Sequence, residues 1–305
     1  MKRRTFLENI ALASVGATLI SPSAFGASLN GSANAKFPLN FAPHDGMFKA
    51  HAGEDILDQL RFMASEGFTA FEDNELKSRS VATQKAMASL MRKNNMTMGV
   101  FVAHKIYWKE PNLAGGDPKL REEFLQDIRD SVAVAKRIGA KWMTVVPGYV
   151  DLRRSKDYQT ANVVESLKQA AAILEPHGLV MVLEPLNFRN HPGMFLSESP
   201  QAYQICKAVN SPACKILFDI YHQQIQEGNL IPNIEACWDQ IAYFQIGDNP
   251  GRKEPGTGEI NYNNVFKYIH SRGFDGILGM EHGNSMPDKA GERAVIDAYI
   301  KASAF

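Results

Sequence analysis

Short apolar runs alternate with longer amphipathic segments from about residue 37 to the end of the chain. The short runs are typical of buried strands, and the longer segments have the spacing of apolar residues that is typical of helices. The pattern predicts eight strands, at 38–43, 68–72, 97–103, 141–146, 179–184, 214–219, 241–246 and 276–281. It predicts helices between and after them, at 54–66, 81–94, 118–139, 158–176, 199–209, 228–238, 261–272 and 289–302.

Eight strand–helix units without a break define the fold class. Several helices begin at a cap with an early proline, as at Asp117-Pro118, and several end at a glycine, as at Gly139. This order predicts an α/β protein, a single (β/α)8 TIM barrel over residues 37–305. A doubly wound sheet is the alternative, but it would more often carry a G-x-G-x-x-G string after the first strand, and that string is absent.

The N-terminus has the features of a targeting segment. Lys2-Arg3-Arg4-Thr5-Phe6-Leu7 precedes an apolar run from Ile10 to Ile20, which is too short to span a membrane. The pattern resembles a twin-arginine export signal. We therefore expect a signal peptide at 1–26, a linker at 27–36, a periplasmic protein and no stable membrane anchor.

Charge and cysteine content narrow the choice of partners. Lys and Arg number 33 and Asp and Glu also number 33, so the chain lacks the net positive charge of a general nucleic-acid binder. Three cysteines cannot form a disulfide framework. Endonucleases that share the barrel fold need a histidine-rich multi-zinc cluster, and the eight histidines here are scattered. We expect no nucleic-acid partner.

Four successive predicted strands, the fifth to the eighth, end in an oxygen-bearing side chain: Glu184, Asp219, Gln245 and Glu281. In a TIM barrel the chemistry lies at the carboxyl ends of the strands, and strand alternation places the four side chains on one face of their strands. If that face points inward, the four converge. Three crowded carboxylates repel one another unless a cation is present, and an all-oxygen set suits Mg²⁺ or Mn²⁺. One such ion is therefore the predicted cofactor.

Two further features lie beside this set. His222 comes three residues after Asp219. A glycine- and proline-rich loop at 247–260 is long for a strand–helix connection and carries Arg252. Loops of this kind often carry binding residues, and a guanidinium is a natural partner for a carboxylate or an oxyanion.

The strings at 184–187 (EPLN), 218–223 (FDIYHQ), 245–252 (QIGDNPGR) and 254–262 (EPGTGEINY) resemble the hydroxypyruvate isomerase family. That family belongs to the xylose isomerase-like TIM barrels, which also include ketose 3-epimerases. The resemblance covers about 37–300 and is strongest over 179–283. It implies that Glu184, Asp219, Gln245 and Glu281 bind the metal, that Glu184 and Glu281 form the catalytic acid/base pair, and that His222 and Arg252 hold the substrate.

The first half of the chain departs from the family pattern. The loops that carry His44 and His104 differ, so both histidines are candidate substrate contacts, with a loop or supporting role as the alternative. Glu72, at the end of the second strand, matches a recurrent acid of the family. We include it among the candidate substrate-site residues, with an exposed carboxylate as the alternative.

The resemblance implies a metal-dependent isomerase that converts hydroxypyruvate to tartronate semialdehyde, or a related keto-sugar, by proton transfer through an enediolate. Residues 37–305 would then be the catalytic domain. Export favours a free keto-sugar over hydroxypyruvate, which is a cytosolic metabolite, so the substrate stays open as a keto-sugar or a hydroxy-keto acid. A ketose 3-epimerase, a metal-assisted eliminase and a non-catalytic carbohydrate-binding barrel are the alternatives. A homo-oligomer is compatible with the sequence.

Overall fold

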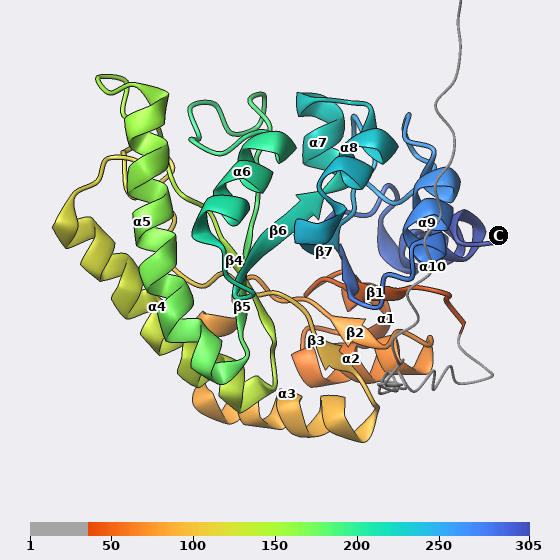
Figure 1. Ribbon diagram of the computed structural model, residues 1–305. Coiled ribbons are helices and arrows are strands. Elements are labelled where there is room, and N and C mark those ends of the chain that lie inside the picture. Colours follow the sequence, from red (N-terminus) through yellow and green to blue (C-terminus); the bar gives the residue numbers. More distant parts are fainter. Residues whose placement is uncertain (1–35) are drawn as a thin grey trace, which may run out of the picture. The chain divides into compact units, whose positions relative to one another are not determined.

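Eight parallel strands enclose an apolar interior in the computed structural model, which describes residues 36–305 (Figure 1). The strands are β1 (Asn40–Pro43), β2 (Ala70–Phe71), β3 (Thr97–Met98), β4 (Trp142–Val145), β5 (Val180–Leu183), β6 (Cys214–Asp219), β7 (Ile241–Gln245) and β8 (Ile277–Met280). Six of them pair in the order β1-β8-β7-β6-β5-β4, and β2 pairs with β3. The predicted TIM barrel is confirmed.

Single β-bridges complete the ring between these two sheets. His44 bridges to Glu72, which joins the end of β1 to the end of β2, and Val102 bridges to Thr144, which joins the chain after β3 to β4. The prediction extends β3 to residue 103, but its ladder ends at Met98. The N–H of Val100 points instead at the Tyr243 hydroxyl, 3.4 Å away.

Helices cover the outside of the strands and follow one another in chain order (Figure 1). They are α1 (Lys49–Ala52), α2 (Ile56–Ser65), α3 (Val81–Lys93), α4 (Pro118–Ile138), α5 (Lys156–Leu174), α6 (Ser199–Val209), α7 (Ile220–Gln226), α8 (Leu230–Ala236), α9 (Tyr262–Ser271) and α10 (Asp288–Ala302). Short 3-10 helices lie at η1 (Leu76–Ser78), η2 (Glu175–His177) and η3 (Trp238–Gln240).

The eight predicted helices are present, and α1 and α7 are additional. Helix α4 shows why the ends could be predicted. The Asp117 side chain accepts from the Lys119 N–H, Pro118 opens the first turn, and Gly139 ends the helix in the left-handed conformation at φ 83°. The predicted signal peptide at 1–26 and the predicted linker up to residue 35 lie outside the described residues. Within 36–305, no helix is long and apolar enough to cross a membrane.

Two apolar layers fix which strand face points inward. A small cluster fills the barrel and includes Val182 of β5, Leu217 of β6 and Tyr243 of β7. A much larger cluster lies between the strands and the helices and includes Phe218 and Phe244. Because side chains alternate along a strand, the residues two positions after the inner cluster also face the barrel axis, at its carboxyl-terminal rim.

Candidate active site

The four strand-end residues come together at this rim. Glu184 directly follows β5, Asp219 and Gln245 end β6 and β7, and Glu281 directly follows β8. Asp219 is the register partner of Gln245 in the sheet, and Gln245 is the partner of Gly279. Glu184, Asp219 and Gln245 are buried, and Glu281 is partly exposed. The convergence predicted from strand alternation is therefore present.

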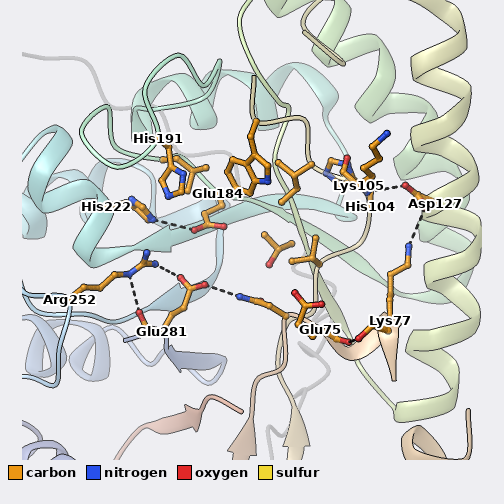
Figure 2. Close-up of a pocket in the computed structure, with 17 residues that line it drawn as sticks. Glu75, Lys77, His104, Lys105, Asp127, Glu184, His191, His222, Arg252 and Glu281 are labelled. Atoms are coloured by element: carbon orange, nitrogen blue, oxygen red, sulfur yellow. Dashed lines mark hydrogen bonds and ion pairs between the residues drawn. The ribbon is translucent and has the colours of Figure 1, made fainter. Parts of the chain in front are cut away.

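A cavity of about 600 Å³ opens above these residues. Figure 2 shows Glu184, His191, His222, Arg252 and Glu281 gathered at one end, which we call the carboxylate end. At the other end, which we call the distal end, lie Glu75, Lys77, His104, Lys105 and Asp127. Both ends belong to one continuous pocket, so a ligand can contact the two groups at once.

Asp219 both caps a helix and lies close to two other side chains of the site. Its Oδ1 accepts from the His222 N–H at 3.0 Å, which caps α7. Its Oδ2 lies 3.4 Å from Nη2 of Arg252 and 3.7 Å from Nε2 of His222. Helix α7 follows β6 directly, so one carboxylate both caps the helix and lies next to Arg252.

Gln245 has the orientation expected of a metal ligand. Its Nε2 donates to Oε1 of Glu72 at 2.9 Å, and this bond fixes the amide. Its Oε1 is buried and has no hydrogen-bond partner within the described part of the chain. A buried carbonyl oxygen without a donor is costly, and a cation beside it would remove that cost.

Glu72 supports this arrangement from inside the barrel. It is fully buried, and its Oε2 accepts from the Tyr243 hydroxyl at 2.7 Å. Gly279 makes room for it, since a Cβ there would lie 1.9 Å from Glu72 Oε2. Burial raises the pKa of Glu72 to about 7. The acid lies below the rim and contacts Gln245.

His222 lies within reach of two carboxylates, but its hydrogen-bond partners favour a donor role. Its Nδ1 lies 2.6 Å from Nδ2 of Asn187 and 3.3 Å from the Asn187 N–H, and both are donors. The ring proton therefore belongs on Nε2, which lies 3.8 Å from Oε1 of Glu184. Burial and Arg252 lower the pKa of His222 to about 3, so the ring is neutral. An N–H at Nε2 can donate to a ligand oxygen but cannot bind a metal.

The carboxylates at the carboxylate end carry more negative charge than the single guanidinium of Arg252 offsets. Burial raises the pKa of Glu184 well above its usual value, and the charges of Glu281 and Asp219 raise it further. Burial also raises the pKa of Asp219, which Arg252 partly offsets. A divalent cation would relieve this repulsion. The donor set of three carboxylates and one amide oxygen fits a hard ion such as Mg²⁺ or Mn²⁺.

Arg252 is held at the site by the 247–260 loop. The buried carboxylate of Asp248 accepts from four main-chain N–H groups of this loop, those of Asn249, Gly256, Gly258 and Ile260. Arg252 itself has φ 48° and donates from Nε to the main-chain oxygen of Glu281 at 3.2 Å. Its Nη2 lies 2.5 Å from Oε2 of Glu281. The guanidinium is thus positioned before any ligand binds.

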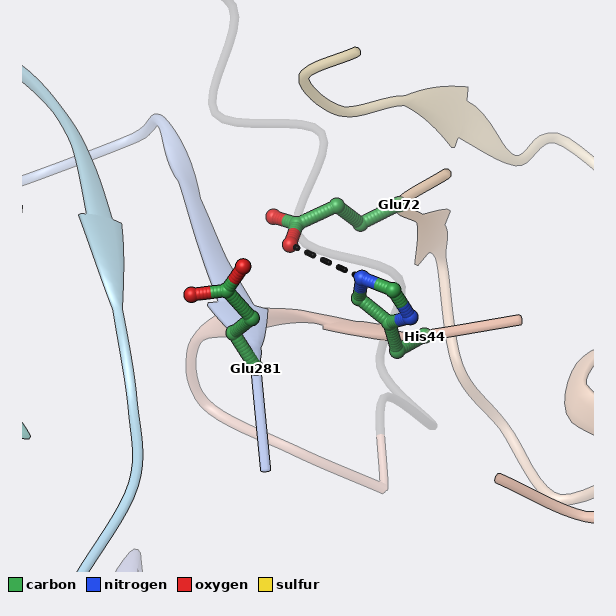
Figure 3. Close-up of side chains that lie close together, drawn as sticks. All are labelled: His44, Glu72 and Glu281. Atoms are coloured by element: carbon green, nitrogen blue, oxygen red, sulfur yellow. Dashed lines mark ion pairs between the residues drawn. The ribbon is translucent and has the colours of Figure 1, made fainter. Parts of the chain in front are cut away.

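The two histidines of the first half have different surroundings. His104 lies 2.9 Å from the Lys105 oxygen through Nδ1, and its Nε2 is the acceptor for the Val146 N–H at 3.2 Å. Both ring nitrogens are therefore engaged by the main chain, although His104 lines the cavity. Nε2 of His44 lies 3.8 Å from Oε1 of Glu72, and Glu281 lies beside the two (Figure 3). His44 also lines a second cavity of about 580 Å³.

Sequence reasoning missed several residues of the cavity. Asn74 donates to Oε1 of Glu281 at 2.9 Å, and Asn187 orients His222. Thr144, Trp108 and His191 also line the pocket. Asn187 is part of the 184–187 string, and Asn74 lies two residues after Glu72, so their nearness to strand ends could have indicated them. Nothing local in the sequence indicates Thr144 or Trp108.

A family model named "Xylose isomerase-like TIM barrel" matches residues 60–301. The chain belongs to this family. The hydroxypyruvate isomerase of Escherichia coli K12 is 33% identical over 205 residues, which cover 64% of this chain and 80% of the relative. The 2-oxo-tetronate isomerase of Cupriavidus necator is 30% identical over 238 residues, which cover 77% of this chain and 89% of the relative. The chain is thus related to isomerase enzymes, as its sequence motifs predict.

Solved structures agree on the fold. A protein titled "AP endonuclease, family 2" from Brucella melitensis superimposes with a TM-score of 0.74 at 26% identity, over 83% of this chain and 96% of that one. D-psicose 3-epimerase from Clostridium cellulolyticum H10 has a TM-score of 0.70 at 18% identity, over 87% and 96%. At that identity the epimerase shows the barrel alone.

Proposed function

We propose that this member of the family is a metal-dependent isomerase that moves a proton between neighbouring carbons of a keto-sugar or a hydroxy-keto acid. The observation that carries the proposal is the pair of Glu184 and Glu281, which enter one cavity from β5 and β8 (Figure 2). Two carboxylates on separate strands can reach a bound substrate from two sides. One can take a proton and the other can return one.

The chain's own residues supply most of the required chemistry. A cation bound by Glu184, Asp219, Gln245 and Glu281 would act as a Lewis acid on the substrate carbonyl. The Nε2–H of His222 would donate to a substrate oxygen beside Glu184, since Asn187 holds the opposite nitrogen. The Arg252 guanidinium would stabilise negative charge that develops on the substrate oxygens. Burial raises the pKa of Glu184, which makes its carboxylate more basic and better suited to accept a proton.

The relatives support a small keto compound as the substrate. Their names specify hydroxypyruvate and 2-oxo-tetronate, both of which carry a hydroxyl beside a carbonyl. An epimerase would use the same two carboxylates but return the proton to the same carbon, and an eliminase would release a second product. Product analysis separates the three reactions.

The similarity to a structure titled AP endonuclease does not favour DNA as the substrate. Among residues 36–305, the two close clusters of acidic and histidine side chains each contain a single histidine, His44 or His222, so neither is histidine-rich. The formal net charge of the chain is zero. These features favour a single hard cation over several zinc ions.

The test is proton exchange with deuterated solvent in the Mn²⁺-loaded protein, with hydroxypyruvate and a panel of ketoses. Glu184→Gln and Glu281→Gln keep the shape and one oxygen but remove a basic oxygen, so each should lower turnover at least about a hundredfold. Glu292→Gln is the matched control, since this buried glutamate of α10 bonds to the main chain of Ala50 and His51 away from the cavity. Full turnover in both site variants, or no exchange by the native protein with any compound, contradicts the proposal.

We also propose that the protein is exported in folded form by the twin-arginine route, so the metal would be bound before translocation. The support is the Arg3-Arg4-Thr5-Phe6-Leu7 string before an apolar run. The double substitution of Arg3→Lys and Arg4→Lys should leave the precursor in the cytoplasm. Unchanged export of the double variant contradicts this route.

A further inference from the structure

The cavity is large for the acids that name the relatives. A volume of about 600 Å³ lies within the range of pockets that enclose drug-sized ligands. Hydroxypyruvate has only three carbons and would contact the carboxylate end alone. The distal end, with Lys77, Lys105 and Asp127, would then face solvent without a ligand (Figure 2).

The charges of the distal end are already paired. Lys77 Nζ donates to the Ala103 oxygen at 2.7 Å and lies 3.4 Å from Oδ1 of Asp127. Lys105 Nζ lies 2.9 Å from the Tyr107 hydroxyl and 3.5 Å from a carboxylate oxygen of Glu123. Both cations already have partners within the protein, which makes them weaker partners for a phosphate or carboxylate than unpaired lysines would be. The pairs present polar but nearly neutral groups, which suit hydroxyls.

An exposed aromatic ring lies between the two ends. Trp108 lines the cavity, and 46% of its surface is exposed. Its ring stacks on His191 at 5.2 Å between centroids, and His191 lies 5.3 Å from His222 of the carboxylate end. The indole is therefore held in place beside the site with much of its surface free. Rigid aromatic faces of this kind contribute binding energy at low entropic cost.

The wall of the cavity also carries an unused polar atom. Oγ1 of Thr144 is buried without a hydrogen-bond partner in the part of the chain that the structure describes, and Thr144 is only 3% exposed. Thr144 lies on β4 and lines the same cavity. Buried hydroxyls are normally paired, so this hydroxyl is available to a ligand group in the cavity.

We infer that the substrate is a ketose that carries a second, uncharged sugar unit, which occupies the distal end next to Trp108. The inference rests on the proposed function for the position of the keto group at the carboxylate end. The second unit would contact the Trp108 ring and the polar groups around Lys77, Asp127 and Glu75. A phosphate group on the ketose would gain little binding energy from the distal end, because Lys77 and Lys105 are already paired there.

The test compares affinities by calorimetry in the Mn²⁺-loaded full chain. The probes are D-fructose, D-fructose 6-phosphate and three glucosyl-fructoses with different linkages, namely turanose, maltulose and isomaltulose. At least one disaccharide should bind about tenfold more tightly than D-fructose, and the phosphate should give no such gain. Trp108→Ala should reduce that ratio to within about twofold, whereas Trp108→Phe should retain most of it. Glu75→Ala, at an exposed position of the distal end, should reduce it partly.

Tyr158→Ala is the control, since Tyr158 is an exposed aromatic of α5 that does not line the cavity. The inference is wrong if D-fructose or its phosphate binds as tightly as every disaccharide, if no probe binds, or if Trp108→Ala keeps the full preference. Proton exchange on the same samples tests the proposed function separately. A disaccharide preference without any exchange retains the inference on binding and removes the proposed reaction.

Discussion

The two halves of the barrel rim use buried polar side chains in different ways. On the side of β5 to β8, Oε1 of Gln245 has no hydrogen-bond partner among residues 36–305, and Oδ2 of Asp219 lies 3.4 Å from Nη2 of Arg252. On the side of β1 to β3, His104 has both ring nitrogens engaged by the main chain and Asp73 is paired with Arg79 at 2.5 Å, whereas the buried Nε2 of His44 has no hydrogen-bond partner in the described residues. A buried polar residue at a strand end is therefore a stronger candidate for chemistry when one of its atoms is unsatisfied, as at Gln245 and His44.

Glu72 connects the two halves. It follows β2, but its carboxylate crosses the barrel and accepts from Tyr243 and Gln245 of β7. The first half therefore contributes to the site by orienting a residue of the second half. Substitutions in the second half should therefore change metal binding directly, whereas those in the first half should change stability or the orientation of Gln245.

The largest effect is expected for Asp219→Ala. The change removes one anionic oxygen from a hard-ion site, so bound metal should fall from one per chain to none, and turnover should fall at least about a hundredfold. Metal analysis of the purified protein checks this. Because the change also removes the cap of α7, Asp219→Asn is the second variant, since it retains an oxygen for the His222 N–H. Equal metal content in both variants and the native protein contradicts the assignment.

The strand-end set could be predicted because strand alternation and the parallel barrel are sufficient to bring Glu184, Asp219, Gln245 and Glu281 together. These properties depend on local pattern and fold alone. The same reasoning gave no way to distinguish His44 from His104. Their difference depends on main-chain groups of Lys105 and Val146, whose positions follow from loop paths that leave no local pattern.

Two other features were out of reach for similar reasons. Helix α7 has seven residues, too few to show a helical repeat, although it is the element that carries His222. The exposed position of Trp108 depends on its stacking with His191, a residue more than eighty positions away in the chain. Contacts of this kind are set by tertiary packing, not by local pattern.

The second-largest effect is expected on the free energy of unfolding, for a substitution in the first half of the rim. Arg79→Met leaves the buried carboxylate of Asp73 without its guanidinium partner, which should lower the free energy of unfolding by about 3 kcal/mol. Urea titration checks this, and metal content should stay unchanged. Adding Asp73→Asn should restore part of the loss, because a neutral amide is less costly to bury than a charge. If Arg79→Met lost its metal, the first half of the rim would also be required for metal binding, and the two halves would not differ in this role.

A smaller effect is expected at the link between the halves. Glu72→Leu removes the acceptor that fixes the Gln245 amide, so the Gln245 oxygen is no longer held in place for a metal and metal affinity should fall about tenfold. Calorimetric titration with Mn²⁺ measures it. Tyr243→Phe is the matched control, because it removes the bond to Oε2 of Glu72 and leaves the Gln245 bond intact. An unchanged affinity in Glu72→Leu would show that Gln245 is oriented by other contacts.

The smallest effect is expected at Glu66, which does not line the cavity. Arg293 contacts both carboxylate oxygens at 2.8 and 3.0 Å, and Lys36 contacts one at 3.0 Å. The hydrogen bond from Arg293 is the main reason that the pKa of Glu66 is lowered to about 2 from its ordinary 4.5. A lowered pKa in the folded state adds stability above pH 4.5, and this is lost as the pH falls towards 2.

Because solvent screens a surface pair, the gain at pH 7 should be about 1 kcal/mol. Glu66→Gln should therefore be less stable than the native protein by about that amount at pH 7, and the difference should fall by more than half at pH 3. Urea titrations at the two pH values measure it. Glu235→Gln is the control, since Glu235 is exposed and lies 3.8 Å from Arg272, so its difference should be near zero at both values. A Glu66→Gln difference that does not change with pH would assign the effect to packing instead of charge, and metal content should be unaffected in every case.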